Sequence, residues 1–116
     1  MYDENCLFCK IIKGEIPSDK VFEDDKIFAF RDINPAAPQH ILIIPKIHIE
    51  SLDAMQEEHK ELFGEIIYRA SQLAKELGFN ESGYRIVANT NKNAGQTVYH
   101  FHLHLLAERS LTWPPG

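Results

Sequence analysis

Apolar and polar residues alternate most clearly near the C-terminus, where residues 100–104 read His-Phe-His-Leu-His and continue into two leucines. Successive side chains of a β-strand point to opposite faces. The pattern therefore predicts a strand from Thr97 to Ala107 with three histidines on one face and apolar residues on the other. A helix would scatter the histidines, because residues two apart do not share a helix face.

Four further segments have the composition of strands. The continuous apolar run in the third of them predicts a central strand covered on both faces, and Asp24-Asp25 predicts a hairpin turn between the first two. The predicted strands are Lys20–Glu23, Ile27–Arg31, His40–Ile44 and Tyr84–Thr90.

Helical spacing dominates the middle of the chain. Apolar residues recur every three or four positions from about Asp53 to Leu77, and Gly78 follows where a helix would stop. A shorter helix is expected over Cys6–Ile12. These elements predict an α+β fold, a mainly antiparallel five-stranded sheet with one long helix and a short N-terminal helix. With 116 residues, we expect a single domain over residues 1–116.

Composition and charge exclude some partners. The formal net charge of −5 argues against nucleic acid and anionic membranes, which attract basic surfaces. The acidic, polar start does not resemble a signal peptide, and no apolar run approaches membrane-spanning length. We therefore expect a cytoplasmic location, where Cys6 and Cys9 would stay reduced.

Packing explains the apolar half of the alternating segment but not its histidines. Three imidazoles on one face concentrate groups that titrate near neutrality and can act as nucleophile, acid, base or metal ligand. Neutral imidazole is abundant at pH 7 and suits a two-step displacement at phosphorus. Gly95-Gln96-Thr97, just before the segment, can supply donors to a phosphate, and Asp32, in a proline-shaped loop, can accept from ribose hydroxyls.

Several motifs along nearly the whole chain resemble the histidine triad (HIT) superfamily, and more narrowly its Hint branch. The resemblance implies a HIT-like fold and a homodimer. It also implies a nucleotide hydrolase or nucleotidyl transferase that cleaves purine nucleoside 5′-phosphoramidates at the α-phosphate through a nucleotidyl-histidine intermediate. The motifs are Phe8 with 10–12, 15–17, 22–25, 32–33, 44–46 with 48–49, 83–89, 95–106 and Trp113-Pro114-Pro115-Gly116.

The same resemblance implies roles for individual residues. His102 would be the nucleophile, with His100, His104 and Thr97 as the other catalytic residues. The family commonly has serine at the position of Thr97, and that serine is thought to pass a proton to the leaving amine. Threonine keeps the hydroxyl but restricts its rotamers, so binding of the phosphate is a firmer expectation for Thr97 than this proton transfer. The implied nucleotide-binding set is Asp32, Ile33, Phe8, Ile11, Phe30, Asn89, Gly95, Gln96, Thr97, His102 and His104.

The pair Cys6-x-x-Cys9 suggests a metal. Two cysteines and two histidines form a closed tetrahedral zinc site, and some relatives carry one whose later ligands match His48 and His100. The zinc would be structural and would leave His102 free, so no metal is expected to be required for catalysis.

Other functions stay open at this point. The same nucleophile could serve a dinucleoside polyphosphate hydrolase, although the Trp113–Gly116 ending favours the Hint branch. A non-catalytic protein that binds a purine nucleotide of the AMP or GMP type, as a sensor or scaffold, would need no nucleophile. A catalytic metal site made of the three histidines is disfavoured, because three ligands on one strand are too spread to converge.

Overall fold

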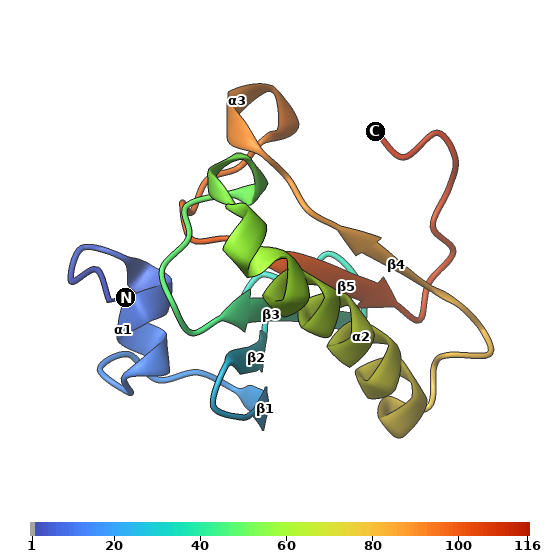
Figure 1. Ribbon diagram of the computed structural model, residues 1–116. Coiled ribbons are helices and arrows are strands. Elements are labelled where there is room, and N and C mark those ends of the chain that lie inside the picture. Colours follow the sequence, from blue (N-terminus) through green and yellow to red (C-terminus); the bar gives the residue numbers. More distant parts are fainter. Residues whose placement is uncertain (1) are drawn as a thin grey trace.

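The computed structural model describes residues 2–116 and contains one five-stranded antiparallel sheet (Figure 1). The order of the strands across the sheet is β1-β2-β3-β5-β4. Their bounds are β1 (Lys20–Glu23), β2 (Ile27–Arg31), β3 (Gln39–Pro45), β4 (Tyr84–Val87) and β5 (Leu103–Ala107). The predicted five-stranded sheet and the two predicted helices are confirmed.

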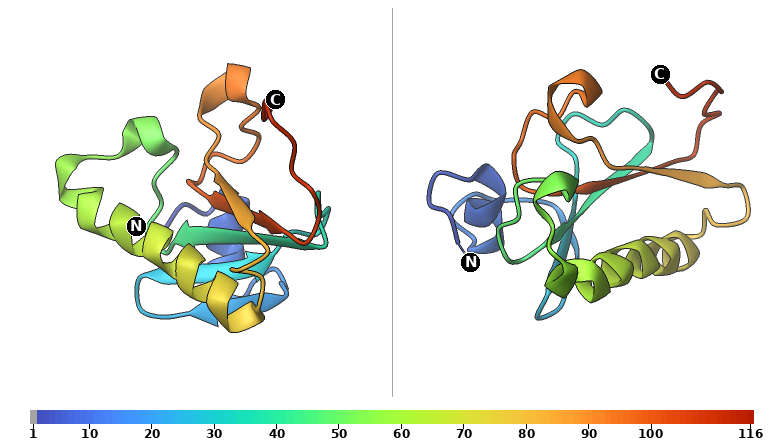
Figure 2. Two further views of the ribbon diagram at one scale, coloured as in Figure 1. Left: turned by 90° about the vertical axis from the view of Figure 1, so that its right-hand side faces the viewer. Right: turned by 45° about the horizontal axis from the view of Figure 1, so that its top comes forward.

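The helices differ greatly in length. The long α2 (Lys60–Leu77) ends at Gly78, whose left-handed backbone (φ 85°) closes the helix. The short α1 (Leu7–Ile12) has Cys6 as its N-cap. Figure 2 shows α3 (Asn91–Ala94, orange) projecting where the chain passes from β4 towards β5. No helix within residues 2–116 is long and apolar enough to cross a membrane.

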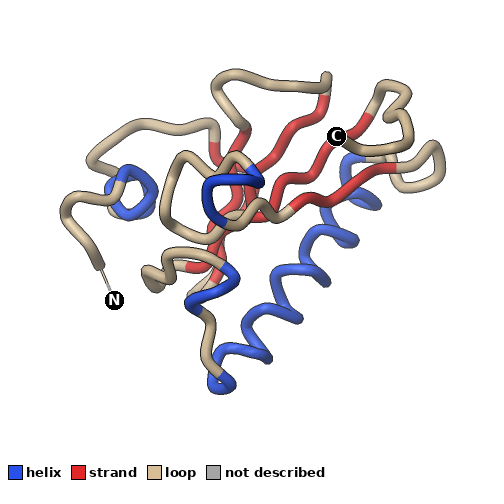
Figure 3. The backbone as a smooth tube through the Cα atoms, turned by 90° about the horizontal axis from the view of Figure 1, so that it is seen from above, coloured by secondary structure: helices blue, strands red, loops and turns tan. Residues whose placement is uncertain are grey.

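The sheet lies between α1 and α2 (Figure 3). The core on the α2 side contains Ile27, Ala29, Ile41, Ile43, Ile66, Ala70, Leu73, Ala74, Phe79, Phe101, Leu103, Leu105 and Ala107. The core on the α1 side contains Cys6, Phe8, Cys9, Ile11, Phe28, Phe30, Leu42 and Ile44. Residues of β2 and β3 alternate between the two cores, which explains why β3 is apolar at four consecutive positions, Ile41–Ile44.

The register of β3 and β5 brings two distant histidines to the α1 side of the sheet. Leu42 pairs with His104, and His40 lies two residues before Leu42 on the same face. Leu103 and Leu105, which flank His104, point into the α2-side core. Of the three histidines predicted on one strand face, only His104 lies within β5, and His100 and His102 lie in the irregular segment just before it.

Two predicted strands are longer than the observed ones. The strand expected over Thr97–Ala107 begins only at Leu103, because the Phe101 N–H donates to the Ile49 carbonyl (2.6 Å) instead of continuing the ladder. The strand expected over Tyr84–Thr90 ends at Val87, before α3. Before Leu103 the apolar alternation extends beyond the strand-to-strand hydrogen bonds, whereas after Val87 the chain leads into α3 through its N-cap Thr90.

The predicted long helix also starts late. Instead of beginning near Asp53, α2 starts at Lys60, after two 3₁₀ turns at Leu52–Ala54 and Glu57–His59. The His59 N–H donates to the Gln56 backbone carbonyl (2.9 Å), and His59 Nδ1 accepts from the Gln56 N–H (3.0 Å). This reciprocal capping sets the entry to the helix, and an apolar period alone does not reveal it.

Candidate functional site

A cavity of about 920 Å³ lies on the α1 side of the sheet. Its wall combines apolar side chains from α1 and β2 with polar groups from β5 and the loop after β2. Among its lining residues are eight of those predicted to bind nucleotide: Phe8, Ile11, Phe30, Asp32, Ile33, Thr97, His102 and His104. An apolar cleft with a few convergent polar groups is the usual form of a small-ligand site.

Three predicted nucleotide-binding residues do not line this cavity: Asn89, Gly95 and Gln96. The Gln96 side chain is buried, and its amide is used by the backbone. Its Oε1 accepts from the Asn91 N–H (2.9 Å), while Nε2 donates to the Glu50 carbonyl (2.8 Å) and the Val98 carbonyl (3.2 Å). The expectation that this side-chain amide faces a phosphate is therefore not met, and Gln96 instead braces the loop before Thr97.

His102 has one defined tautomer. Its Nδ1 lies 2.7 Å from the His100 carbonyl, which can only accept, so Nδ1 carries the proton and Nε2 keeps a free lone pair. The edge of the Phe8 ring packs against the imidazole, with ring centroids 5.1 Å apart. Burial lowers the pKa of His102, so the ring is neutral at neutral pH. A neutral imidazole with a free Nε2 is the form required for nucleophilic attack.

The orientation of His104 is set by a chain of hydrogen bonds. The Ala36 N–H donates to His40 Nδ1 (2.9 Å), so the proton of neutral His40 is on Nε2. That Nε2 lies 2.9 Å from His104 Nδ1, which must accept, and the His104 proton is therefore on Nε2. Burial lowers the pKa of His104 to about 4, so this ring also stays neutral at neutral pH. His104 thus presents a donor where His102 presents an acceptor.

His40 is a site residue that the sequence reasoning missed. Its side chain is buried, lies 3.5 Å from the Asp32 carboxylate, and contacts His104. In the sequence it is simply the first residue of an apolar run. The available signal is its position in the strand: His40 lies on the same face of β3 as Leu42, and Leu42 pairs with His104 in the antiparallel ladder.

Asp32, His40 and His104 also have the composition of a metal site, and their ligand atoms lie within 4.8 Å of one another. The hydrogen bonds argue against this use. His40 Nε2 carries a proton as long as the Ala36 N–H occupies Nδ1, and a protonated nitrogen cannot bind a cation. These three residues are therefore best described as a hydrogen-bond relay, which we call the relay cluster.

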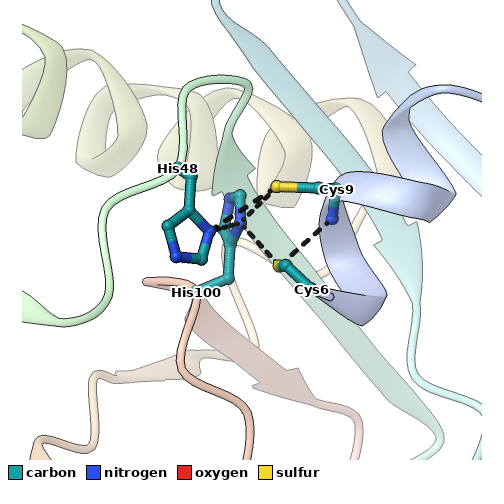
Figure 4. Close-up of side chains that lie close together, drawn as sticks. All are labelled: Cys6, Cys9, His48 and His100. Atoms are coloured by element: carbon teal, nitrogen blue, oxygen red, sulfur yellow. Dashed lines mark hydrogen bonds between the residues drawn. The ribbon is translucent and has the colours of Figure 1, made fainter. Parts of the chain in front are cut away.

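A second cluster joins three separate elements of the fold (Figure 4). Cys6 and Cys9 come from the start of α1, His48 from the loop after β3, and His100 from the segment before β5. The His100 Nδ1 lies 3.3 Å from Cys6 Sγ, 3.6 Å from Cys9 Sγ and 3.3 Å from His48 Nδ1. The His48 Nδ1 lies 3.5 Å from Cys9 Sγ. We call these four residues the metal cluster.

The spacing of the metal cluster fits a tetrahedral ion. An ion about 2.0 Å from each nitrogen and about 2.3 Å from each sulfur holds its ligands about 3.3–3.8 Å apart. Outside the cluster, His100 Nε2 donates to the Pro45 carbonyl (2.8 Å), which leaves Nδ1 free to bind. The four predicted ligands are thus brought together in a geometry that can hold a metal ion.

Without an ion, burial keeps Cys6 and His100 uncharged. It raises the pKa of the Cys6 thiol to about 11 and lowers that of His100 to about 4. Metal binding would therefore displace the proton of the Cys6 thiol. Four ligands complete a tetrahedron and leave no open position for substrate, which is typical of a structural centre.

Comparisons with known proteins agree with this fold. The family described as HIT domain matches residues 13–111. The chain is 51% identical over 116 residues to the 14 kDa zinc-binding protein of Zea mays, covering 98% of this chain and 90% of that protein. It is 50% identical over 108 residues to the purine nucleoside phosphoramidase of Escherichia coli K12, covering 93% and 91% of the two chains.

A solved structure is also similar over the whole fold. The crystal structure of a HIT family hydrolase from Legionella pneumophila Philadelphia 1 superimposes with a TM-score of 0.94 at 56% identity, covering 97% of this chain and all of the other. With the family match over most of the chain and the paired histidines on one sheet face, we conclude that this chain belongs to the HIT domain family.

Proposed function

We propose that the protein hydrolyses purine nucleoside 5′-phosphoramidates at the α-phosphate through a nucleotidyl intermediate on His102. The observation that carries the proposal is the 2.7 Å contact between His102 Nδ1 and the His100 carbonyl, which leaves Nε2 unprotonated on a residue of the cavity wall. The 50% identity to a protein named purine nucleoside phosphoramidase supports the class of substrate.

In the first step, His102 Nε2 forms a bond to the α-phosphorus while the bond from phosphorus to the leaving nitrogen breaks. The leaving nitrogen takes a proton from water, and the Thr97 hydroxyl on the cavity wall binds the departing group by a hydrogen bond. The His100 carbonyl stabilises the positive charge that develops on the His102 ring.

In the second step, water attacks the phosphorus and releases one proton to solvent, the bond to His102 Nε2 breaks, and a nucleoside monophosphate leaves. His104 assists both steps as a neutral donor from Nε2 to a phosphate oxygen, because His40 occupies its other nitrogen. A donor held ready in this way does not need to reorient as charge builds on the phosphate.

The remaining cavity residues suit the nucleoside. The Asp32 carboxylate accepts from the ribose hydroxyls, and the base lies among Phe8, Ile11, Phe30 and Ile33. Ile33 is 91% exposed, which supports its use in covering a ligand, since residues 2–116 leave most of its side chain uncovered. Asn89 and Gly95 are proposed to contribute only from behind this wall, through the loop that carries Thr97.

We propose that the metal cluster binds structural zinc. The two thiols and two imidazoles suit this ion, and a relative at 51% identity is named a zinc-binding protein. When bound, the zinc supplies a closed tetrahedral centre that fastens α1, and no step of the reaction passes through it.

We also propose that the protein works as a homodimer in the cytoplasm. The support for a dimer is the free edge of β4, where Tyr84 and Ile86 are exposed, and the exposed Tyr68 on α2. An edge strand with uncovered apolar side chains is a ready surface for pairing.

The test is to trap radiolabelled nucleotide on the protein during turnover of adenosine 5′-phosphoramidate. We expect label on histidine in the natural protein and none in His102→Ala, with turnover reduced by about 10⁴-fold or more. A matched variant, His104→Ala, should still form the adduct, only more slowly. Turnover near the natural rate in His102→Ala would show that the mechanism is wrong.

The alternative activity is dinucleoside polyphosphate hydrolysis, which uses the same nucleophile and a different leaving group. Rates measured side by side with adenosine 5′-phosphoramidate and a diadenosine polyphosphate distinguish the two activities. A higher kcat/KM for the polyphosphate would replace the proposed substrate while keeping the mechanism. Tight nucleotide binding with no turnover of either compound would instead identify a binding protein.

A further inference from the structure

The short helix α1 serves two sites at once. Cys6 and Cys9 belong to the metal cluster, while Leu7, Phe8 and Ile11 line the cavity. The two sets interleave along the six residues from Cys6 to Ile11, so α1 cannot move away from one site without moving away from the other.

Two contacts connect the metal cluster directly to His102. The side chain of His100 faces both cysteines, while its backbone carbonyl accepts from His102 Nδ1. The Phe8 ring, carried between the two cysteines, packs edge-on against both imidazoles, with centroids 6.0 Å from His100 and 5.1 Å from His102. A residue of the metal cluster and a residue of the cavity wall thus both touch the ring of the nucleophile.

The position of α1 depends on what it packs against. Six residues are too few for a helix that is stable by itself in water. Phe8, Cys9 and Ile11 are buried against the sheet, and the cysteines face histidines from two other elements. We call α1 docked when it is packed against the sheet in this way. A ligand that binds only when α1 is docked stabilises that docked state.

We infer that a metal in the cluster and a nucleotide in the cavity favour the same docked position of α1, so that each raises the affinity for the other. Phe8 and His100 are the positioning residues that carry this coupling to His102. The inference rests on the proposed nucleotide-binding function. Reciprocity is thermodynamically required: the factor by which nucleotide tightens metal binding equals the factor by which metal tightens nucleotide binding.

The experiment measures the Kd of Zn²⁺ by competition with a chelator, with and without saturating AMP, at the same buffered free zinc. We expect AMP to lower the zinc Kd by about 5-fold or more, the lower end of usual coupling between sites. The reciprocal titration of AMP into zinc-loaded and zinc-stripped protein should give the same factor. Neither titration requires a variant, and circular dichroism verifies that the stripped protein stays folded.

Two variants then test the route. Phe8→Ala keeps all four ligands but removes the ring that touches His100 and His102, so the coupling factor should fall towards 1. Ile12→Ala is the matched control, because Ile12 packs on the same core without lining the cavity. We expect this control to weaken α1 packing in general while keeping the natural coupling factor.

The outcomes separate this inference from the function on which it rests. If AMP binds and the zinc Kd changes by less than about 5-fold, the coupling is wrong and the proposed function stands. If the factor is the same in Phe8→Ala as in the natural protein, the route through Phe8 is wrong. If the protein binds no AMP, the proposed hydrolase function fails. If it binds no zinc, the inference and the proposed zinc site fail together, and the proposed hydrolase function stands.

Discussion

The metal cluster and the relay cluster each contain a histidine two residues from His102, and these two histidines have different uses. His100 and His104 are each two residues from His102, and each has one ring nitrogen occupied by a hydrogen bond. In His100 the occupied atom is Nε2, which leaves Nδ1 facing two thiols. In His104 it is Nδ1, which leaves Nε2–H for the cavity. The partner of the second nitrogen, rather than the histidine itself, decides whether the ring is a ligand or a donor.

The clusters also differ in enclosure. The metal cluster satisfies all four of its ligand atoms internally, whereas the relay cluster ends at the cavity, where His104 and Asp32 line the wall. A closed set contributes mainly to stability, and an open set is available to a substrate. Changes to the two clusters should therefore separate stability from activity.

The largest expected effect comes from removing both thiols. In Cys6→Ser/Cys9→Ser, bound zinc should fall from one ion per chain to none. Zinc at 100–1,000 times its Kd should stabilise the natural protein by about 3–4 kcal/mol and leave the variant unchanged. Urea unfolding with and without zinc measures this difference. His40→Gln is the control, and a loss of zinc there would contradict the separation of the clusters.

A somewhat smaller effect is expected from breaking the relay. His40→Leu leaves His104 Nδ1 without its donor, so the ring can take the tautomer that presents no donor to the phosphate. We expect kcat to fall about 10- to 100-fold with zinc content unchanged. His40→Gln should recover part of the rate, because its amide can donate to the same nitrogen. Equal rates in the leucine variant and the natural protein would show that the relay has no role.

The smallest effect is a pH dependence of stability. The pKa of His104 is about 4 in the folded chain, against about 6.5 for an unperturbed histidine, so the unfolded chain binds more protons between these values. The free energy of unfolding should therefore fall as pH decreases from about 6.5 to 4. In His104→Asn this fall should be smaller by about 1 kcal/mol, after allowing for partial exposure of the ring.

Denaturant titrations at a series of pH values measure this slope. Thr97→Ser is the matched variant, since it changes the same cavity wall without removing a titratable group. An unchanged slope in His104→Asn would mean that His104 does not contribute to acid sensitivity.

Sequence patterns predicted the bounds of a strand correctly where the apolar pattern and the hydrogen-bonded pairing of the strand cover the same residues. The predicted ranges of β1 and β2 match the structure, and β3 is longer by one residue at each end. Errors occur where a tertiary hydrogen bond ends an element, as when the Phe101 N–H turns to Ile49. Apolar period cannot report such a bond, because the side-chain pattern continues across it.

The candidate site shows the same division. The metal cluster was predictable because Cys6 and Cys9 form a recognisable pair and the resemblance supplied the histidines. His40 was missed because its role depends on strand register, which no local pattern contains. For Gln96, the sequence suggested that the side-chain amide binds phosphate. In the structure this amide instead forms hydrogen bonds with the backbone of Asn91 and Glu50.

The placement of α1 has a consequence for how the parts of this protein can be exchanged. The HIT domain match begins at residue 13, immediately after α1 ends at Ile12, so both cysteines lie outside it while all the histidines of both clusters lie inside. The segment that completes the metal cluster thus lies outside the range that the family match covers. A homologous chain could gain or lose the ion by replacing about a dozen residues, with the reactive histidines and the sheet beneath them left intact.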